Sequence, residues 1–137
     1  MKENQNITGL LGCGWLGFPL ATCLISKGYN VRASTTSPGK LGLMKQAGID
    51  PYLVQFSFSE TSPGLDRILD SDLLIISVPP GRRNQDGFEI YGKMISELCE
   101  RIPRSRVRRV ILISSTSVYP HSNGIVNEYS DIFPETA

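Results

Sequence analysis

Hydrophobic residues along the chain fall into short runs that alternate with amphipathic stretches. Five apolar runs bounded by glycine, proline or polar residues predict buried strands at 7–11, 29–34, 51–56, 72–78 and 107–114. Between them, apolar residues at helical spacing predict helices over 16–27, 40–47 and 88–102, with a short one opened by Ser62-Pro63. This alternation predicts an α/β fold, a doubly wound parallel sheet in the order 3-2-1-4-5. The last stretch, 121–137, is expected to be a loop with a short pairing around Ile125-Val126.

A glycine motif lies where the first predicted strand gives way to the first helix. Gly12, Gly14 and Gly17 have the spacing G-x-G-x-x-G. The first glycine suits a tight turn, the second lets the backbone approach a pyrophosphate, and the third allows close packing of helix on strand. Unpaired N–H groups at the helix start then face the phosphates. The motif therefore predicts a Rossmann-type domain that binds a dinucleotide.

The other residues of this motif, Cys13, Trp15 and Leu16, are also predicted to contact the cofactor. A cysteine at a helix N-terminus can have a lowered pKa and act as a nucleophile, or it can simply fill a small site beside a phosphate. Trp15 can form a wall for nicotinamide or substrate, or it can be a packing residue. Both alternatives stay open at this point.

The end of the second strand bears on which dinucleotide fits. An NAD site places Asp or Glu roughly 20 residues beyond the glycines to bind the ribose 2′-hydroxyl. Here the chain has no carboxylate; it has the hydroxyls of Ser34, Thr35 and Thr36, flanked by Arg32 and Lys40. These side chains favour the 2′-phosphate of NADP, with NAD as the alternative. In the alternative interpretation, these hydroxyls serve only to cap the next helix, and Arg32 points away from the site.

Composition limits the remaining functions. A chain of 137 residues with a formal charge of +1 predicts one domain with no global attraction to nucleic acid or membrane. The arginines between 101 and 109 are interpreted as a solvated rim. Three cysteines without metal-ligand spacing predict no metal site and reduced thiols in a cytoplasmic protein. No apolar run approaches the roughly 20 residues that a membrane span needs.

Two further strand ends carry candidate residues. After the fourth strand, Val78, Pro79 and Pro80 form a rigid turn predicted to pass close to the cofactor, and Arg82-Arg83 follow as anion ligands or as a solvated pair. The fifth strand ends in S-S-T-S-V-Y, residues 114–119. Together with G-C-G-W-L-G and V-P-P-G-R-R, this motif gives the chain a pattern that resembles the extended short-chain dehydrogenase/reductases. These include the NAD-dependent epimerase/dehydratase group and an atypical bacterial branch of it.

The resemblance implies that Ser114 borders the cofactor and that Ser115 hydrogen-bonds the reacting carbonyl or hydroxyl of a small-molecule substrate. The family's acid/base tyrosine lies in a Y-x-x-x-K motif, which this chain lacks. We therefore expect residues 1–137 to be a single NAD(P)-binding domain, the N-terminal part of a longer oxidoreductase or epimerase/dehydratase-like enzyme, inactive alone. Alternatives are a catalytically silent NADP-sensing or interaction module and a dehydrogenase with a separate catalytic domain. An uncovered apolar face would favour homo-oligomers.

Overall fold

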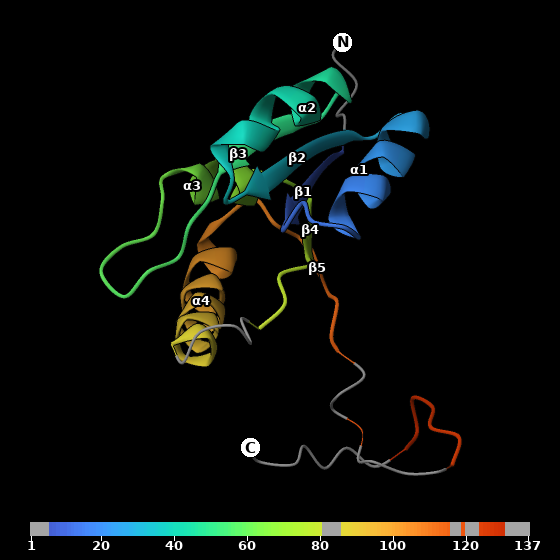
Figure 1. Ribbon diagram of the computed structural model, residues 1–137, viewed down its shortest axis with the longest axis vertical. Coiled ribbons are helices and arrows are strands. Elements are labelled where there is room, and N and C mark those ends of the chain that lie inside the picture. The colour runs from blue at the N-terminus through green and yellow to red at the C-terminus, as the bar shows by residue number, and fades with distance from the viewer. Residues whose placement is uncertain (1–5, 81–85, 116–118, 120–123, 131–137) are drawn as a thin grey trace.

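The computed structural model describes residues 6–80, 86–115, 119 and 124–130. Five parallel strands form one sheet in the order β3-β2-β1-β4-β5, which confirms the predicted topology (Figure 1). The chain moves outward from β1 in one direction and then returns to build β4 and β5 on the other side. The strands are β1 (Ile7–Leu11), β2 (Asn30–Thr35), β3 (Asp50–Leu53), β4 (Leu73–Ile76) and β5 (Arg109–Leu112).

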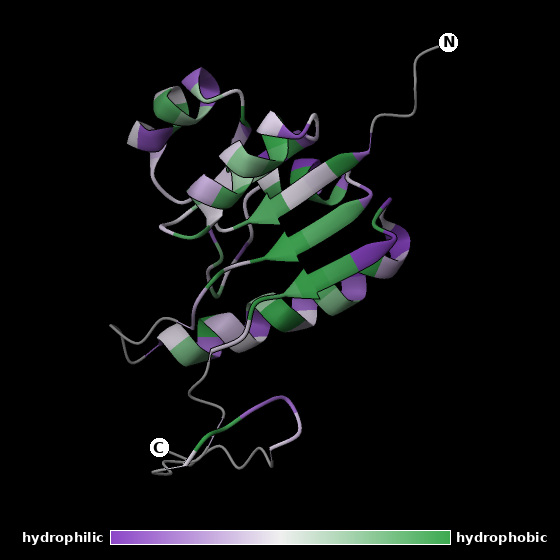
Figure 2. Cartoon of the chain, turned by 90° about the vertical axis from the view of Figure 1, so that its right-hand side faces the viewer, coloured by the Kyte–Doolittle hydropathy of each residue, from purple (hydrophilic) through white to green (hydrophobic). Residues whose placement is uncertain are grey.

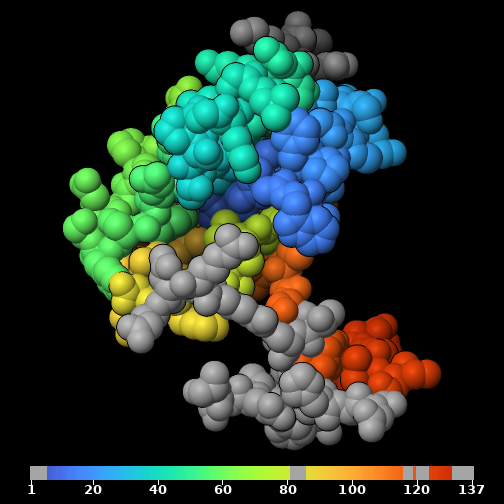
Figure 3. All heavy atoms as spheres, in the orientation of Figure 1, coloured from blue at the N-terminus to red at the C-terminus, as the bar shows by residue number. Residues whose placement is uncertain are grey.

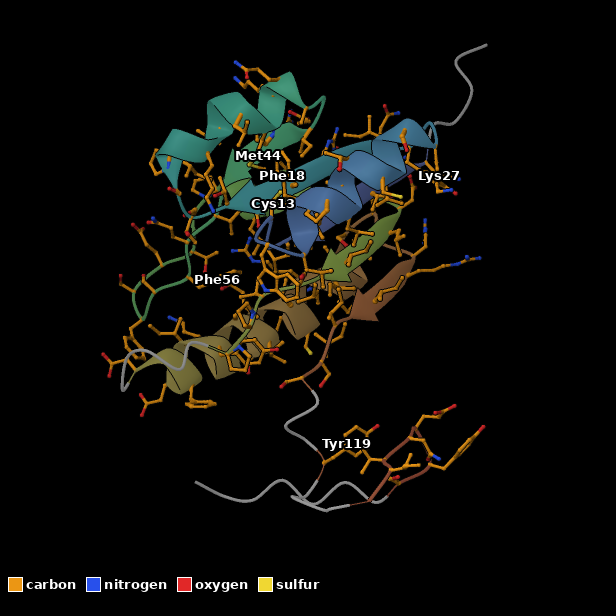
Figure 4. The ribbon with its side chains drawn as sticks, turned by 45° about the vertical axis from the view of Figure 1, so that its right-hand side comes forward. Cys13, Phe18, Lys27, Met44, Phe56 and Tyr119 are labelled. Carbon is orange, nitrogen blue, oxygen red and sulfur yellow. The ribbon has the colours of Figure 1, made fainter. Side chains whose placement is uncertain are left out.

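Helices cover both faces of the sheet. They are α1 (Gly17–Ser26), α2 (Leu41–Gln46), α3 (Gly64–Leu69) and α4 (Gly87–Arg101), with short 3-10 turns at Pro38–Lys40 and Ile102–Arg104. Because side chains alternate along a strand, Leu10 and Leu11 of β1 enter different cores. Leu10 packs with residues of α1 and α2, among them Phe18 and Met44, which lie together in Figure 4. Leu11 packs with residues of α3 and α4.

The hydropathy of the residues matches the positions of the strands and helices. The central strands are apolar along most of their length, whereas the helices alternate apolar and polar stripes (Figure 2). At the sheet edge, β5 differs from the central strands, because Val110, Ile111 and Leu112 are 45%, 49% and 52% exposed. Neighbouring residues of a strand point to opposite faces, so both faces of β5 are partly uncovered.

Three predicted strands differ from the structure by more than one residue at an end. The strand expected at 51–56 ends at Leu53, and the chain then turns into a hairpin that carries Phe56. The strands expected at 72–78 and 107–114 are shorter, because their final residues leave the sheet and line clefts at its carboxyl edge. The pairing expected around Ile125-Val126 is wrong: in the described segment 124–130 these residues form no strand, and Ile125 is fully exposed.

Candidate dinucleotide site

The three motif glycines have distinct environments. Gly12 has a φ of +100°, and a Cβ there would lie 2.7 Å from the backbone oxygen of Ser77. A Cβ on Gly17 would lie 2.2 Å from the carbonyl oxygen of Gly12, so only glycine lets α1 begin this close to β1. A Cβ on Gly14 would meet nothing within 4 Å. The turn and the helix packing therefore require Gly12 and Gly17, whereas Gly14 leaves open space beside the backbone.

Ser34 holds the glycine loop in place. Its hydroxyl accepts the Gly12 N–H at 2.8 Å, and its carbonyl oxygen accepts the Cys13 N–H, also at 2.8 Å. Ser34 is 3% exposed, so these bonds are shielded from water. The end of β2 thus orients the loop that follows β1.

Two clefts flank this loop at the carboxyl edge of the sheet. The first, about 220 Å³, is lined by Leu11, Gly12, Cys13, Gly14, Ser34, Thr35, Thr36, Lys40, Val54, Phe56, Ser77, Val78 and Pro79. The second, about 250 Å³, is lined by Gly14, Trp15, Leu16, Ser77, Val78, Pro79, Pro80, Ile113, Ser114 and Ser115. Both clefts include Gly14 and the turn after β4, so they meet where the strand order reverses. Figure 3 shows the dark blue end of β1 recessed between blue and cyan segments and the yellow-green turn after β4.

The structure brings the predicted site residues to these clefts. Every described candidate from the sequence lines one or both of them except Gly17, which packs beneath the loop, and Arg32. Arg82-Arg83 lie outside the described residues. The sequence reasoning did not name Leu11, Ser77 and Ile113 as site residues, nor Val54 and Phe56, which follow β3 at the same edge of the sheet. The rule that ligands bind beyond the carboxyl ends of strands could have found them.

Cys13 lies on the wall of the first cleft and is 6% exposed (Figure 4). Burial raises the pKa of the Cys13 thiol, and the positive charge of Lys40 opposes this only in part. A raised pKa keeps the sulfur protonated, which is the opposite of what a nucleophile needs. Of the two roles considered for Cys13, the structure supports the small residue beside the loop.

Trp15 is 90% exposed at the rim of the second cleft. The alternative that Trp15 is a packing residue is therefore wrong, because its side chain is not buried against the described part of the chain. The opening beside it is largely apolar, with Leu16, Pro80 and Ile113 among its lining residues, and three serines also line it.

Arg32 does not belong to the site. It lies at the amino half of β2, where its guanidinium bonds Asp70 at 2.6 Å and approaches Asp50 at 3.7 Å. Of the two alternatives for Arg32, contact with a 2′-phosphate is therefore wrong, and the side chain points away from the site, toward the end of α3.

Within the described ranges, no group of three or more His, Cys, Asp or Glu side chains could hold a metal ion. No helix in the described part of the chain is long and apolar enough to cross a membrane.

The chain is 36% identical over 129 residues to Protein YeeZ of Escherichia coli strain K12. The matched region covers 93% of this chain and 47% of YeeZ. The chain therefore spans about half the length of the curated relatives it matches. No protein-family model matches the sequence.

Solved structures share the fold. A conserved protein of unknown function from Silicibacter pomeroyi superposes with a TM-score of 0.67 at 21% identity, covering 96% of this chain and 43% of that one. MoeE5, solved with UDP-glucose and NAD, has a TM-score of 0.66 at 22% identity, covering 94% and 42%. Gre2 of Candida albicans, solved with NADPH, has a TM-score of 0.60 at 15% identity, covering 82% and 38%. The chain has the Rossmann-type fold of these proteins.

Proposed function

We propose that residues 1–137 form the NAD(P)-binding domain of an oxidoreductase or epimerase/dehydratase-like enzyme. One observation carries the proposal: two clefts meet at Gly14, beside the start of α1, at the strand-order reversal of a parallel sheet. Open α/β sheets bind dinucleotides at this place. The solved complexes of MoeE5 and Gre2 with NAD and NADPH support this cofactor class.

The residues present fit a dinucleotide. The open space beside Gly14 would admit a pyrophosphate, and N–H groups at the start of the ten-residue helix α1 would face it. The first cleft would then take the adenosine and the second the nicotinamide. When bound, the nicotinamide supplies hydride transfer.

We propose that the first cleft takes NADPH in preference to NADH. None of its described lining residues is Asp or Glu, the type that binds the 2′-hydroxyl of NAD. Thr36 and Lys40 are exposed on its wall, and the positive charge of Lys40 acts to lower the pKa of the Cys13 thiol on the same wall. A hydroxyl and an ammonium there suit a 2′-phosphate.

Ser114 and Ser115 line the second cleft, which we propose to take the nicotinamide. The Ser115 hydroxyl would orient a substrate carbonyl or hydroxyl, but a serine supplies no strong acid or base. The sequence has no Y-x-x-x-K motif to add one. We therefore propose that the 137 residues bind NADP(H) without turnover, and that a longer cytoplasmic enzyme supplies the remaining chemistry.

The decisive experiment is a fluorescence titration. Trp15 is the only tryptophan of the chain and lies on the second cleft, and reduced nicotinamide absorbs where tryptophan emits. Bound NADPH should therefore quench Trp15 and emit by energy transfer. Gly14→Val fills the space beside the loop and should weaken binding about tenfold or more, a loss of at least 1.4 kcal/mol. Gly42→Ala in α2 is the control, because its Cβ also meets nothing within 4 Å.

Lys40→Met tests the choice of cofactor. It should weaken NADPH binding and leave NADH binding nearly unchanged, since only NADPH carries the 2′-phosphate. Tighter binding of NADH than NADPH by the wild-type chain would refute the 2′-phosphate assignment. Absence of binding by both would refute the proposed function.

We also propose that copies of this chain associate through the exposed edge strand β5. Val110, Ile111 and Leu112 on the edge strand present apolar surface that contact with another copy would remove from water. Size-exclusion chromatography of the 137-residue chain should give a species larger than the monomer, and Ile111→Lys should shift it to the monomer. A wild-type monomer at all concentrations would contradict this expectation.

A further inference from the structure

Residues 55–62, between β3 and α3, form a closed turn that we call hairpin 55–62. At its base the Gln55 N–H donates to the Ser62 hydroxyl at 2.9 Å, and the Ser62 N–H donates to the Gln55 carbonyl at 3.1 Å. Phe56 and Thr61 then pair as an antiparallel bridge. These bonds define the shape of the hairpin but leave its position on the molecule to other contacts.

Two residues on adjacent turns of α4 supply those contacts. The Lys93 ammonium donates to the carbonyl oxygens of Ser57, at 3.0 Å, and Phe58. The Glu97 carboxylate accepts the Thr61 hydroxyl at 2.5 Å. An ammonium and a carboxylate thus hold the two sides of the hairpin tip against one helix, and bonds to charged groups are stronger than neutral ones.

The other side of the hairpin reaches the first cleft. Phe56 lines that cleft together with Thr36 and Lys40. The Gln55 side-chain amide donates to the Thr36 carbonyl oxygen at 3.2 Å. Any shift of the hairpin along α4 therefore moves an aromatic wall of the cleft and loosens the turn that carries Thr36.

We propose that Lys93 and Glu97 are positioning residues for the adenosine end of the dinucleotide, because they hold hairpin 55–62 against the first cleft. The proposal rests on the proposed function, since it needs the adenosine in this cleft. Neither residue lines the cleft itself. They act through Phe56 and Gln55 and leave the second cleft unchanged.

The test measures binding of 2′,5′-ADP, the adenosine half of NADPH, and of NADPH itself to the full chain and its variants. Lys93→Met and Glu97→Ala should each raise the Kd for both ligands by the same factor, about threefold to tenfold, because each removes charge-assisted hydrogen bonds that hold a wall of the cleft but none to the ligand itself. Glu97→Gln keeps an acceptor for Thr61 and should stay within about twofold of the wild type. Glu100→Ala is the control on the same helix, because the Glu100 carboxylate bonds no described residue. This variant should bind both ligands as the wild type does.

Energy transfer from Trp15 at saturating NADPH should stay at the wild-type level in all variants, because the second cleft is not part of the hairpin. A general loss of structure would lower it. Wild-type affinity of Lys93→Met and Glu97→Ala for 2′,5′-ADP would overturn the inference while leaving the proposed function intact. An equal loss in Glu97→Gln and Glu97→Ala would assign the effect to the Glu97–Arg101 ion pair and overturn the role of Glu97. Failure of the wild-type chain to bind NADPH or 2′,5′-ADP would overturn both proposals.

Discussion

Replacing Ser34 with alanine tests how the glycine loop is held. The Ser34 hydroxyl is the acceptor for the Gly12 N–H at 2.8 Å, in a position that is 3% exposed. Ser34→Ala removes this acceptor and leaves a shielded N–H without a partner. An unsatisfied buried donor costs about 1–3 kcal/mol, so we expect the free energy of unfolding to fall by about 2 kcal/mol. The Cys13 bond to the Ser34 carbonyl oxygen is retained, which limits the loss to one interaction.

Urea unfolding followed by circular dichroism measures this effect. With an m-value of about 2 kcal/mol per molar for a domain of this size, the midpoint should fall by roughly 1 M. Ser26→Ala is the matched control, because the Ser26 hydroxyl is exposed and bonds only its own helix, at Cys23. Its free energy of unfolding should stay within about 0.5 kcal/mol of the wild type. Equal stability of Ser34→Ala and Ser26→Ala would refute the reasoning, and NADPH titration of Ser34→Ala should show weakened binding because Gly12 is no longer held.

Three other predictions follow from the same structure. Gly17→Ala places a Cβ 2.2 Å from the Gly12 carbonyl oxygen and should lower stability by about 1–3 kcal/mol in thermal unfolding; a wild-type melting temperature would contradict it. Hydrogen bonds from the Ile7 N–H and from Arg106 hold the pKa of Asp72 below its usual range. The ionised carboxylate therefore stabilises the fold fully above the ordinary aspartate pKa of about 4, and this stabilisation is lost as the pH falls through the lower pKa of the folded state. Asp72→Asn should therefore flatten the acid limb of the stability profile, and an unchanged limb would exclude this role. Iodoacetamide should alkylate the two exposed cysteines well before Cys13, as read by mass spectrometry of peptides, and equal rates would contradict its burial and raised pKa.

The topology could be predicted because it follows from local signals. Each strand is a short apolar run, each helix has an amphipathic period, and their alternation admits few arrangements. The glycine spacing also located the loop where the two clefts meet, since the turn requires Gly12 and the packing of α1 requires Gly17. Boundaries were less accurate at 51–56, because Val54 and Phe56 are apolar like the strand before them but line a cleft.

Individual roles at the site depended on contacts between distant segments. Ser34 was predicted as a cofactor ligand, and its hydroxyl in fact bonds Gly12. Whether it also meets the cofactor stays a prediction. Arg32 has a suitable charge and lies on the same strand as Ser34 and Thr35, yet its guanidinium bonds Asp70.

The sequence by itself determined the parallel α/β fold, its strand order and the place of the glycine loop, because these arise from periodicity and from backbone needs a few residues long. Only the tertiary structure decided which side chains meet across segments: Ser34 with Gly12, Arg32 with Asp70, and Lys93 and Glu97 with hairpin 55–62. Polar side chains such as these have several suitable partners in the sequence, and strand register and helix placement select among them.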